Sequence, residues 1–476
     1  MGHDLTAIRG TFFDFVGDPW NHVGNEAKSA RFYRDGLLVV EHGKIKAFGA
    51  FDKISAQFQD VSITHIQDRL ILPGFIDGHI HFPQTRILGS YGQQLLPWLM
   101  QWVFPEEKKY SDPHYARTGV IHFFDNLLAA GTTTCQAFTT HDPVCTEALF
   151  EEASKRNMRV ISGLTGIDRF APEGSMDSPQ NFYRDSKRLI EKWHKQGRNL
   201  YAITPRFALG CTAEMMTICQ QLKEEYPDAY VNTHISENPA ETKSCLEYHG
   251  TADYLAAYEK YNLVGPRFSG GHGVWLSNDE MRRLSQAGAA ISVCPSSNLF
   301  LGSGLFRLGK AKDPAQPVKL NFGTDVGGGN RFCMIQVLDE AYKVGMCNNT
   351  MLDGSVDSST KDLAEAERNK LSPYRAFWSI TLGSAESLYL DDKIGNFEVG
   401  KEADFVALDW AAGPSATVWH TSLLTEQDGP TTVEEAASIL FSIMTVGDDR
   451  NVDQTWVMGQ RLYCRSAAEP VLAVKR

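Results

Sequence analysis

The chain has 476 residues, of which 42% are hydrophobic and 22% are charged. These proportions are typical of globular proteins, and the length fits one barrel of about 250 residues or more beside a smaller unit. The formal net charge of -12 argues against nucleic acids and acidic membranes as partners, because a negative surface repels phosphate groups. A neutral small molecule meets no such repulsion and is the expected substrate.

Nine cysteines occur without a C-x-x-C pair, and this pattern predicts reduced thiols in a cytoplasmic protein. The opening MGHDLTAIRG has no basic segment followed by an apolar stretch, so we expect no secretory signal. No apolar run approaches the ~18 residues that cross a bilayer. We therefore expect no membrane association.

The chain opens with β-like segments. Residues 1–69 contain TAIRGTFFDFVG, GLLVVEHGKIKAFG and VSITHIQD, separated by Gly, Asp and Asn. Such runs are typical of antiparallel strands.

Residues 70–387 alternate short apolar runs with longer polar stretches, in which apolar residues recur every three or four positions. Eight short runs with helical spacers, each too buried to show clean alternation, predict a parallel (β/α)₈ TIM barrel. The runs span residues 70–81, 131–140, 159–168, 200–209, 229–238, 268–277, 289–298 and 318–329.

Residues 388–476 again have β character, in GNFEVGKEADFVALD and QTWVMGQRLYC. We expect 1–69 and 388–476 to join in one small β-sandwich as its N-terminal and C-terminal parts. The predicted fold class is therefore α/β, with the active site in the barrel of residues 70–387 and a β-sandwich domain formed from both chain ends.

Candidate metal ligands stand where the predicted strands end, which is where barrel enzymes keep their active sites. The first strand ends in DGHIH (77–81), and residues two apart on a strand point the same way. His79 and His81 would thus present two imidazoles together. The fifth, sixth and eighth strands end with further candidates: His234, His272 and Asp325.

One histidine alone is as well explained by a surface or hydrogen-bonded core position, but several at equivalent strand ends predict a metal site. Nitrogen and oxygen ligands with one open position are typical of catalytic zinc. Iron or manganese would suit the same ligands. Glu237, three residues after His234, is placed to act as a general base beside the water; a solvated loop glutamate is the alternative. His272 could orient that water, and Asp325 could accept a proton.

Several motifs occur together and in order: PGFIDGHIHFPQ, THISEN, HGVWLS, CPSSNLFLGSG and GTDVGGG. In this combination the chain resembles the amidohydrolase superfamily. With TPRF (204–207), LLPWLMQWVFPEE (95–107) and VGKEADFVALD it resembles the guanine deaminases within that superfamily, over most of its length. The resemblance implies zinc-dependent hydrolysis of guanine to xanthine and ammonia, in purine catabolism or salvage, by a homodimer.

The resemblance also implies roles for single residues. Glu237 would move a proton from the water to the purine ring, with His272 and Asp325 as further catalytic residues. The ligands of one zinc ion per subunit would be His79, His81, His234 and Asp325. The fourth strand ends in Pro205-Arg206-Phe207 without a lysine, whereas binuclear relatives carry a bridging carboxylated lysine there. The resemblance therefore implies a mononuclear site.

Substrate contacts are implied for four residues. Gln84 and Arg206 would hydrogen-bond the polar edge of the purine, with the guanidinium at its carbonyl oxygen. Phe207 would pack on the ring. A strand-end salt bridge is the alternative for Arg206. Residues 82–110 are too long for a plain βα connection and predict a lid that carries Trp98 over the pocket, or a surface that packs against a partner subunit.

Three other functions remain open at this stage. The first is an amidohydrolase deaminase that acts on another purine, a pterin or a triazine, which would share every metal ligand. The second is a catalytically silent relative with a scaffolding role, which the full ligand set argues against. The third is a nucleic-acid base deaminase, whose P-C-x-x-C signature is missing from this sequence.

Overall fold

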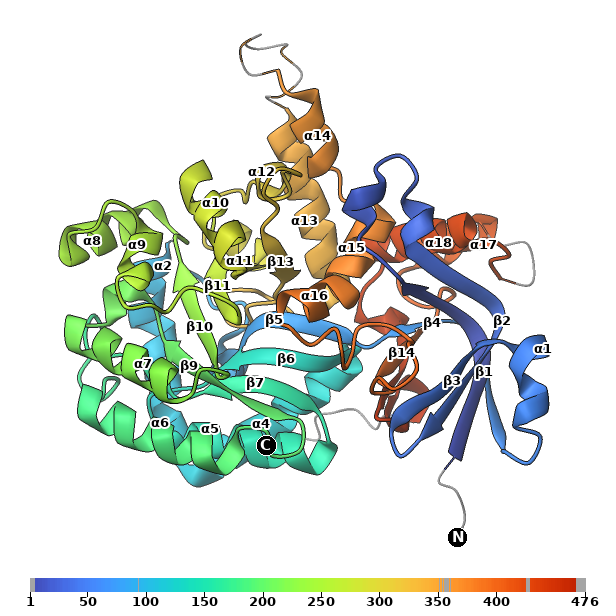
Figure 1. The fold of residues 1–476 in the computed structure, drawn as a ribbon, viewed down its shortest axis with the longest axis horizontal. Coiled ribbons are helices and arrows are strands. Elements are labelled where there is room, and N and C mark those ends of the chain that lie inside the picture. The colour runs from blue at the N-terminus through green and yellow to red at the C-terminus, as the bar shows by residue number, and fades with distance from the viewer. Residues whose placement is uncertain are drawn as a thin grey trace.

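The computed structural model describes residues 5–92, 94–350, 352, 354, 359, 361–424 and 429–467. Figure 1 shows a barrel with helices around it and, beside it, a second sheet in which the blue N-terminal strands and the red C-terminal elements lie together. No helix among the described residues is both long and apolar enough to cross a membrane. None of the nine cysteines is paired in a disulfide, and seven of them are buried.

The barrel strands follow one another in chain order and run parallel. Each coincides with one of the predicted apolar runs, so the predicted fold class is confirmed. The strands are β5 (Phe75–His81), β6 (Thr132–Phe138), β7 (Arg159–Gly163), β9 (Asn199–Pro205), β10 (Tyr230–Ile235), β11 (Phe268–His272), β12 (Ala290–Val293) and β13 (Lys319–Phe322). A two-residue strand, β8 (Thr165–Gly166), pairs with β9.

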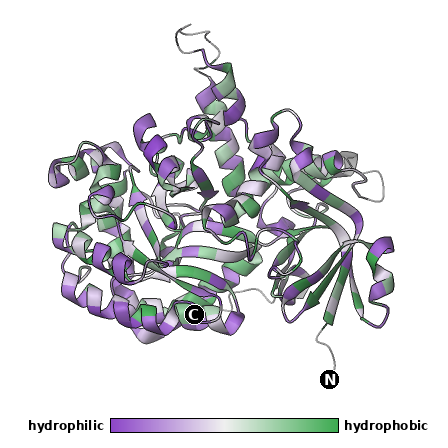
Figure 2. Ribbon diagram, viewed as in Figure 1, coloured by the Kyte–Doolittle hydropathy of each residue, from purple (hydrophilic) through white to green (hydrophobic). Residues whose placement is uncertain are grey.

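The barrel strands lack alternation because both of their faces are covered. Every residue of β5, β6, β7, β11 and β12 is buried, as expected when helices cover the outside of a parallel sheet. Figure 2 shows hydrophobic residues along the barrel strands and many hydrophilic residues along the outer helices. The first and last strands of the barrel are joined just after β13. There the amide of Asp325 donates to the carbonyl of His79, which is in β5, at 2.8 Å.

Helices follow the strands, and several of them begin at residues whose side chains cap the first turn. Before α5, the side chain of Asp142 accepts from the amide of Val144 at 2.9 Å, and Pro143 occupies the first turn. The helices are α4 (Pro113–Ala129), α5 (Pro143–Arg156), α6 (Pro179–Trp193), α7 (Ala213–Glu225), α8 (Pro239–His249), α9 (Tyr254–Glu259), α10 (Asn278–Ala287), α11 (Pro295–Phe300), α12 (Leu308–Ala311), α13 (Met334–Asn349), α14 (Leu363–Asn369), α15 (Pro373–Ser379) and α16 (Leu382–Ser387).

Both chain ends contribute to one seven-stranded mixed sheet with the order β16-β15-β14-β4-β1-β2-β3. Strand β4 is central, because it pairs in parallel with β1 and antiparallel with β14. The parallel pair departs from the purely antiparallel expectation. The strands are β1 (Leu5–Phe15), β2 (Ala30–Glu41), β3 (Lys44–Ala50), β4 (Ile63–Pro73), β14 (Phe405–Leu408), β15 (Val452–Val457) and β16 (Gln460–Cys464). The short helix α1 (Phe51–Ile54) follows β3.

The C-terminal part also contains two helices, α17 (Ser415–Leu424) and α18 (Val433–Val446), which the expectation of β character in this part did not include. The apolar side chains of α18 pack into the main core of the molecule. The side chain of Thr432 caps α18 by accepting from the amide of Glu435.

A buried ion-pair network joins the barrel to the terminal sheet. Arg159 begins β7 and Arg198 directly precedes β9, and both guanidinium groups donate to the carboxylate of Glu402. Arg198 also donates to Asp404, which directly precedes β14. Because guanidinium groups match carboxylates in a fixed fork, this network sets the position of the terminal sheet against the barrel.

Candidate active site

A cavity opens at the C-terminal ends of the barrel strands. Its walls contain every residue that the sequence analysis assigned to the site except His79, which is fully buried. The lining residues are His81, Gln84, Leu95, Trp98, Leu99, Arg206, Phe207, His234, Glu237, Glu241, His272, Leu301, Asp325 and Gly328.

Strand β5 brings the first two histidines to the cavity. The carboxylate of Asp77 accepts from the amide of His79 at 3.1 Å and from both the amide and the hydroxyl of Thr324. Since Thr324 precedes Asp325, these bonds tie the end of β5 to the segment after β13. The rings of His79 and His81 lie 5.4 Å apart.

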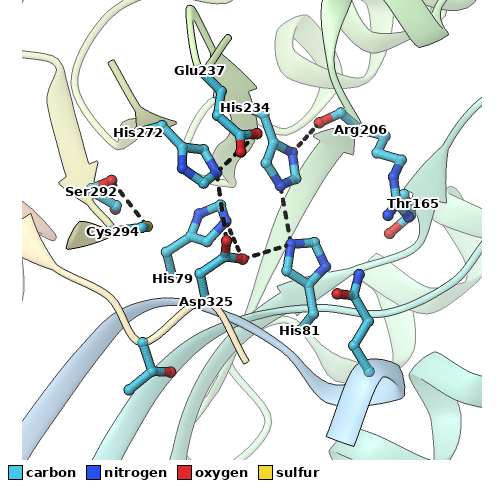
Figure 3. Close-up of polar contacts among 12 residues, drawn as sticks. His79, His81, Thr165, Arg206, His234, Glu237, His272, Ser292, Cys294 and Asp325 are labelled. Carbon is cyan, nitrogen blue, oxygen red and sulfur yellow. Dashed lines mark hydrogen bonds and ion pairs between the residues drawn. The ribbon is translucent and has the colours of Figure 1, made fainter. Parts of the chain in front are cut away.

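His234 lies near the end of strand β10, and one nitrogen of its ring has a hydrogen-bond partner. Its Nδ1 faces the carbonyl oxygen of Arg206 at 2.5 Å, as Figure 3 shows. A carbonyl only accepts, so Nδ1 carries the proton and Nε2 keeps its lone pair. That Nε2 lies 3.0 Å from Nε2 of His81. Burial lowers the pKa of His234 well below its usual range, which keeps the ring neutral.

The ligand atoms of four residues converge. Each of His79, His81, His234 and Asp325 has one such atom within 4.8 Å of all the others. Oδ1 of Asp325 is 3.4 Å from Nε2 of His79 and 3.3 Å from Nε2 of His81. Burial favours the neutral acid, but the facing imidazoles of His79 and His81 lower the pKa of Asp325 well below its usual range.

These four residues fit a metal ion. Both ring nitrogens of His79 and Nδ1 of His81 are buried without a hydrogen-bond partner among the described residues, and unsatisfied buried polar atoms are costly. Burial lowers the pKa of His79 to about 4, so its ring is neutral and able to ligate. Imidazole nitrogens and carboxylate oxygens are donors that suit such an ion.

Glu237 and His272 stand beside this cluster. Nε2 of His272 lies 3.4 Å from Oε2 of Glu237 and 3.8 Å from Oδ2 of Asp325, and Figure 3 shows the three side chains turned toward one another. Nδ1 of His272 donates to Oδ1 of Asn298 at 2.9 Å. Burial raises the pKa of Glu237 to about 7, a value suited to both taking and giving a proton near neutral pH.

The family of the chain follows from its sequence over most of its length. The model for the amidohydrolase family matches residues 70–462. The chain belongs to the amidohydrolase family. The resemblance noted from its motifs is thereby confirmed.

Several relatives of this amidohydrolase are described as guanine deaminases or probable guanine deaminases. It is 42% identical to a guanine deaminase of Escherichia coli K12 over 98% of this chain and 99% of that protein. It is 35% identical to a probable guanine deaminase of Deinococcus radiodurans, with 91% and 94% covered. The crystal structure of a guanine deaminase from Bradyrhizobium japonicum matches it with a TM-score of 0.96 and 68% identity, over 97% of this chain and 99% of that chain.

The stretch predicted as a lid is folded in this amidohydrolase. It contains a 3-10 helix (Phe82–Ile87), α2 (Leu95–Trp98), a π-helix (Leu99–Val103), α3 (Phe104–Glu107) and the start of another 3-10 helix (Lys108–Ser111). Leu95, Trp98 and Leu99 line the cavity, and the indole of Trp98 donates to the carbonyl of Ser90 at 3.2 Å. The stretch therefore forms an apolar wall of the pocket.

Two buried carboxyl groups near the pocket were not predicted from the sequence. Glu107 at the end of α3 contacts both Gln84 and Arg206, so the salt bridge considered for Arg206 exists while Arg206 also lines the cavity. Glu241, four residues after Glu237, accepts from the hydroxyl of Tyr254, and its Oε2 has no hydrogen-bond partner among the residues that the structure describes. Burial raises the pKa of Glu241 to about 8, although the Tyr254 hydrogen bond opposes this.

A cysteine approaches the same cluster. Cys294, with His79 and His272, forms a second group whose potential ligand atoms lie within 4.8 Å of one another. Burial raises the pKa of the Cys294 thiol well above its usual range. Since the thiolate is the form that binds metals, Cys294 is better explained as a packing residue below the site.

Proposed function

We propose that this amidohydrolase is a zinc-dependent guanine deaminase, which hydrolyses guanine to xanthine and ammonia. The observation that carries the proposal is the combination of groups at one cavity. The four possible metal ligands, the buried Glu237, and the side chains of Arg206 and Gln84 all lie at this cavity. The relatives described as guanine deaminases, at 42% and 68% identity over nearly the whole chain, support the same substrate.

We assign the metal to His79, His81, His234 and Asp325, with one ion per chain. Zinc accepts nitrogen and oxygen donors of these kinds, and a catalytic zinc site keeps a position for water and can expand to five ligands. A zinc ion bound by these residues would supply the Lewis acidity that makes water a nucleophile near neutral pH. The hydrogen bond from Nδ1 of His234 to the carbonyl of Arg206 orients that imidazole for the ion.

Glu237 handles the protons in this proposal. Its carboxylate takes a proton from the attacking water and delivers it to the ring nitrogen beside the carbon that bears the amine. The remaining proton of the added water moves through Asp325 to the amine, the C–N bond breaks, and ammonia leaves to give xanthine. His272 holds the water, because Asn298 fixes its Nδ1–H and leaves Nε2 facing Glu237 and Asp325. Asp325 is the second acceptor for a proton.

The purine is held between polar and apolar walls. Arg206 donates to the carbonyl oxygen of guanine, Gln84 bonds its polar edge, and Phe207 packs on the ring. Trp98 closes the pocket from the lid. Because Arg206 is an obligate donor, adenine, which carries an amine where guanine carries the oxygen, is expected to be a poor substrate.

We further propose that the protein is a cytoplasmic homodimer acting in purine catabolism or salvage. The free thiols of all nine cysteines fit a reducing compartment. The dimer rests on the family resemblance. Sedimentation of the purified protein would test it, with a monomeric mass at micromolar concentration as the contrary result.

The direct test measures xanthine and ammonia formed from guanine by the purified protein. We expect turnover of guanine and little or none of adenine, pterins or triazines. Glu237→Gln keeps the size of the side chain but cannot act as a base, so it should bind the same amount of zinc and lose about 10²–10⁴-fold in kcat. A wild-type protein that prefers another of these substrates, or a Gln variant with normal turnover, would refute the proposal.

A further inference from the structure

Glu107 connects the two polar residues that face the substrate. Its carboxylate is buried, with 6% of the residue exposed, and it is divided between two partners. Oε1 accepts from Nε2 of Gln84 at 2.9 Å, and Oε2 accepts from Nη1 of Arg206 at 2.7 Å. Glu107 thus bridges Gln84, which follows β5, and Arg206, which follows β9.

This bridge decides which way the amide of Gln84 points. A carboxylate paired with a guanidinium is an acceptor only, so it must face the NH₂ group of Gln84 and not its oxygen. Oε1 of Gln84 accepts no hydrogen bond from the described residues. A Cβ on Gly327 would lie only 2.0 Å from this oxygen, so the oxygen points to the glycine segment whose next residue, Gly328, lines the cavity.

The same bridge fixes the guanidinium of Arg206. One of its nitrogens is engaged by Glu107, and the ring of Phe104 lies 5.4 Å from its Cζ. The planar group has five N–H donors, so donors remain for a ligand after the ion pair is made. The pocket consequently offers the ligand one obligate donor, the guanidinium of Arg206, and one fixed acceptor, Oε1 of Gln84. The carboxylate of Glu107 holds both groups in place.

We propose that Glu107 is a positioning residue that sets substrate specificity by fixing this donor and acceptor pattern. The inference rests on the proposed deamination of guanine. Guanine carries an acceptor oxygen at position 6, which faces the Arg206 donor, and a donor N1–H beside it, which faces the Gln84 oxygen. 2,6-Diaminopurine has the same amine at the reacting carbon but a donor amine at position 6 and an unprotonated N1, so the fixed pattern rejects it while the chemistry at the reacting carbon is the same.

A purely structural role for Glu107 makes a different prediction. If Glu107 only neutralised a buried guanidinium, its loss would lower stability and would reduce the turnover of both purines in equal proportion. If Glu107 fixes the donor and acceptor pattern, Glu107→Gln changes the turnover of one purine relative to the other. The new amide can donate as well as accept, so Gln84 can turn its oxygen toward residue 107 and present NH₂ to the ligand.

The experiment measures kcat/KM for guanine and for 2,6-diaminopurine in four proteins. Glu106→Gln is the matched control, because Glu106 is as buried as Glu107 but bonds Lys109 and Tyr115 instead. We expect the guanine preference of the wild type to persist in Glu106→Gln and to fall by at least about tenfold in Glu107→Gln. Glu107→Asp keeps an obligate acceptor and should retain more of the preference than Glu107→Gln.

The outcomes separate this inference from the proposed function. A wild type inactive on guanine overturns both. An active wild type whose preference is unchanged in Glu107→Gln, or whose two activities fall equally, overturns the inference alone. Should Glu107→Gln fail to fold, Gln84→Met carries the test, because it removes the fixed acceptor and leaves the Glu107–Arg206 pair intact; an unchanged preference in that variant would refute the role of the bridge.

Discussion

Three carboxyl groups line the pocket, and their surroundings give them different acidities. The imidazoles of His79 and His81 lower the pKa of Asp325 well below its usual range, whereas burial raises the pKa of Glu237 to about 7 and that of Glu241 to about 8. Such divergence separates the roles of chemically similar groups. Asp325 is suited to hold a cation, Glu237 to exchange protons, and Glu241 to remain neutral.

The acidity of Glu241 predicts a pH dependence. Its raised pKa means that the group is neutral below about pH 8 and becomes charged above it. The new charge raises the pKa of the nearby Glu237, so the proton that Glu237 takes from water is held more tightly and is delivered to the ring nitrogen more slowly. We therefore expect kcat/KM for guanine to fall above pH 8 in the wild type. In Glu241→Gln, which cannot ionise, this fall should move to higher pH.

The measurement is the rate of xanthine formation from about pH 6 to pH 10, with kcat/KM taken at each point. Because Glu241→Gln resembles the neutral acid, its activity at neutral pH should stay close to that of the wild type. Identical alkaline limbs in the two proteins would show that Glu241 does not control this step.

The sequence predicted single residues well where one local rule applied. His79, His81, His234, His272 and Asp325 were found because each lies at or close to the C-terminal end of a barrel strand, and parallel strands end on one rim. Glu107 was not found, since its contact with Arg206 spans 99 positions of the chain and depends on how the lid folds. Glu241 lies in the first turn of α8, where a glutamate is ordinarily explained by the helix dipole.

At the scale of elements, the strands of the barrel hold the site by close backbone approach. Gly271 on β11 faces the ring of His79, and a Cβ at this position would lie 2.3 Å from Cε1 of that ring. His272, the next residue, and Asp325, which lies after β13, have φ angles of 71° and 49°. This left-handed conformation costs about 1–3 kcal/mol outside glycine. The strand ends therefore accept strain to aim these side chains into the cavity.

The close contact between Gly271 and the His79 ring predicts what one added methyl group would do. Gly271→Ala should push the His79 ring away from the cluster, with loss of bound zinc and a fall of about 10²-fold or more in guanine turnover. Elemental analysis and xanthine formation would measure both effects. Gly265→Ala is the control, because nothing lies within 4 Å of a Cβ there. An alanine at 271 with full zinc and normal turnover would contradict the packing argument.

Elements were predictable from the sequence to different degrees. The eight barrel strands were found because burial on both faces leaves compact apolar runs separated by amphipathic helices. Helix α18 was missed, since its VEEAASILFSIMTV run has apolar residues on most sides. Thr432 followed by Glu435 was a signal that could have located its start.

At the scale of the whole molecule, the two chain ends close one sheet, and the sheet is tied to the barrel by the pairing of Arg159 and Arg198 with Glu402 and Asp404. This network is remote in sequence, and no local pattern could have predicted it. The site itself is assembled from strands that begin at residue 75 and end at residue 322. Only the complete barrel brings His79 to Asp325.

The central claim is that one cation, held by His79, His81, His234 and Asp325, makes this assembled cavity a guanine deaminase. The most direct test removes metal from the purified protein with a chelator and returns zinc in measured steps while xanthine formation is followed. We expect negligible activity without metal and a linear recovery that ends at one zinc per chain. Full activity in the metal-free protein, or recovery only at two zinc ions per chain, would contradict the account.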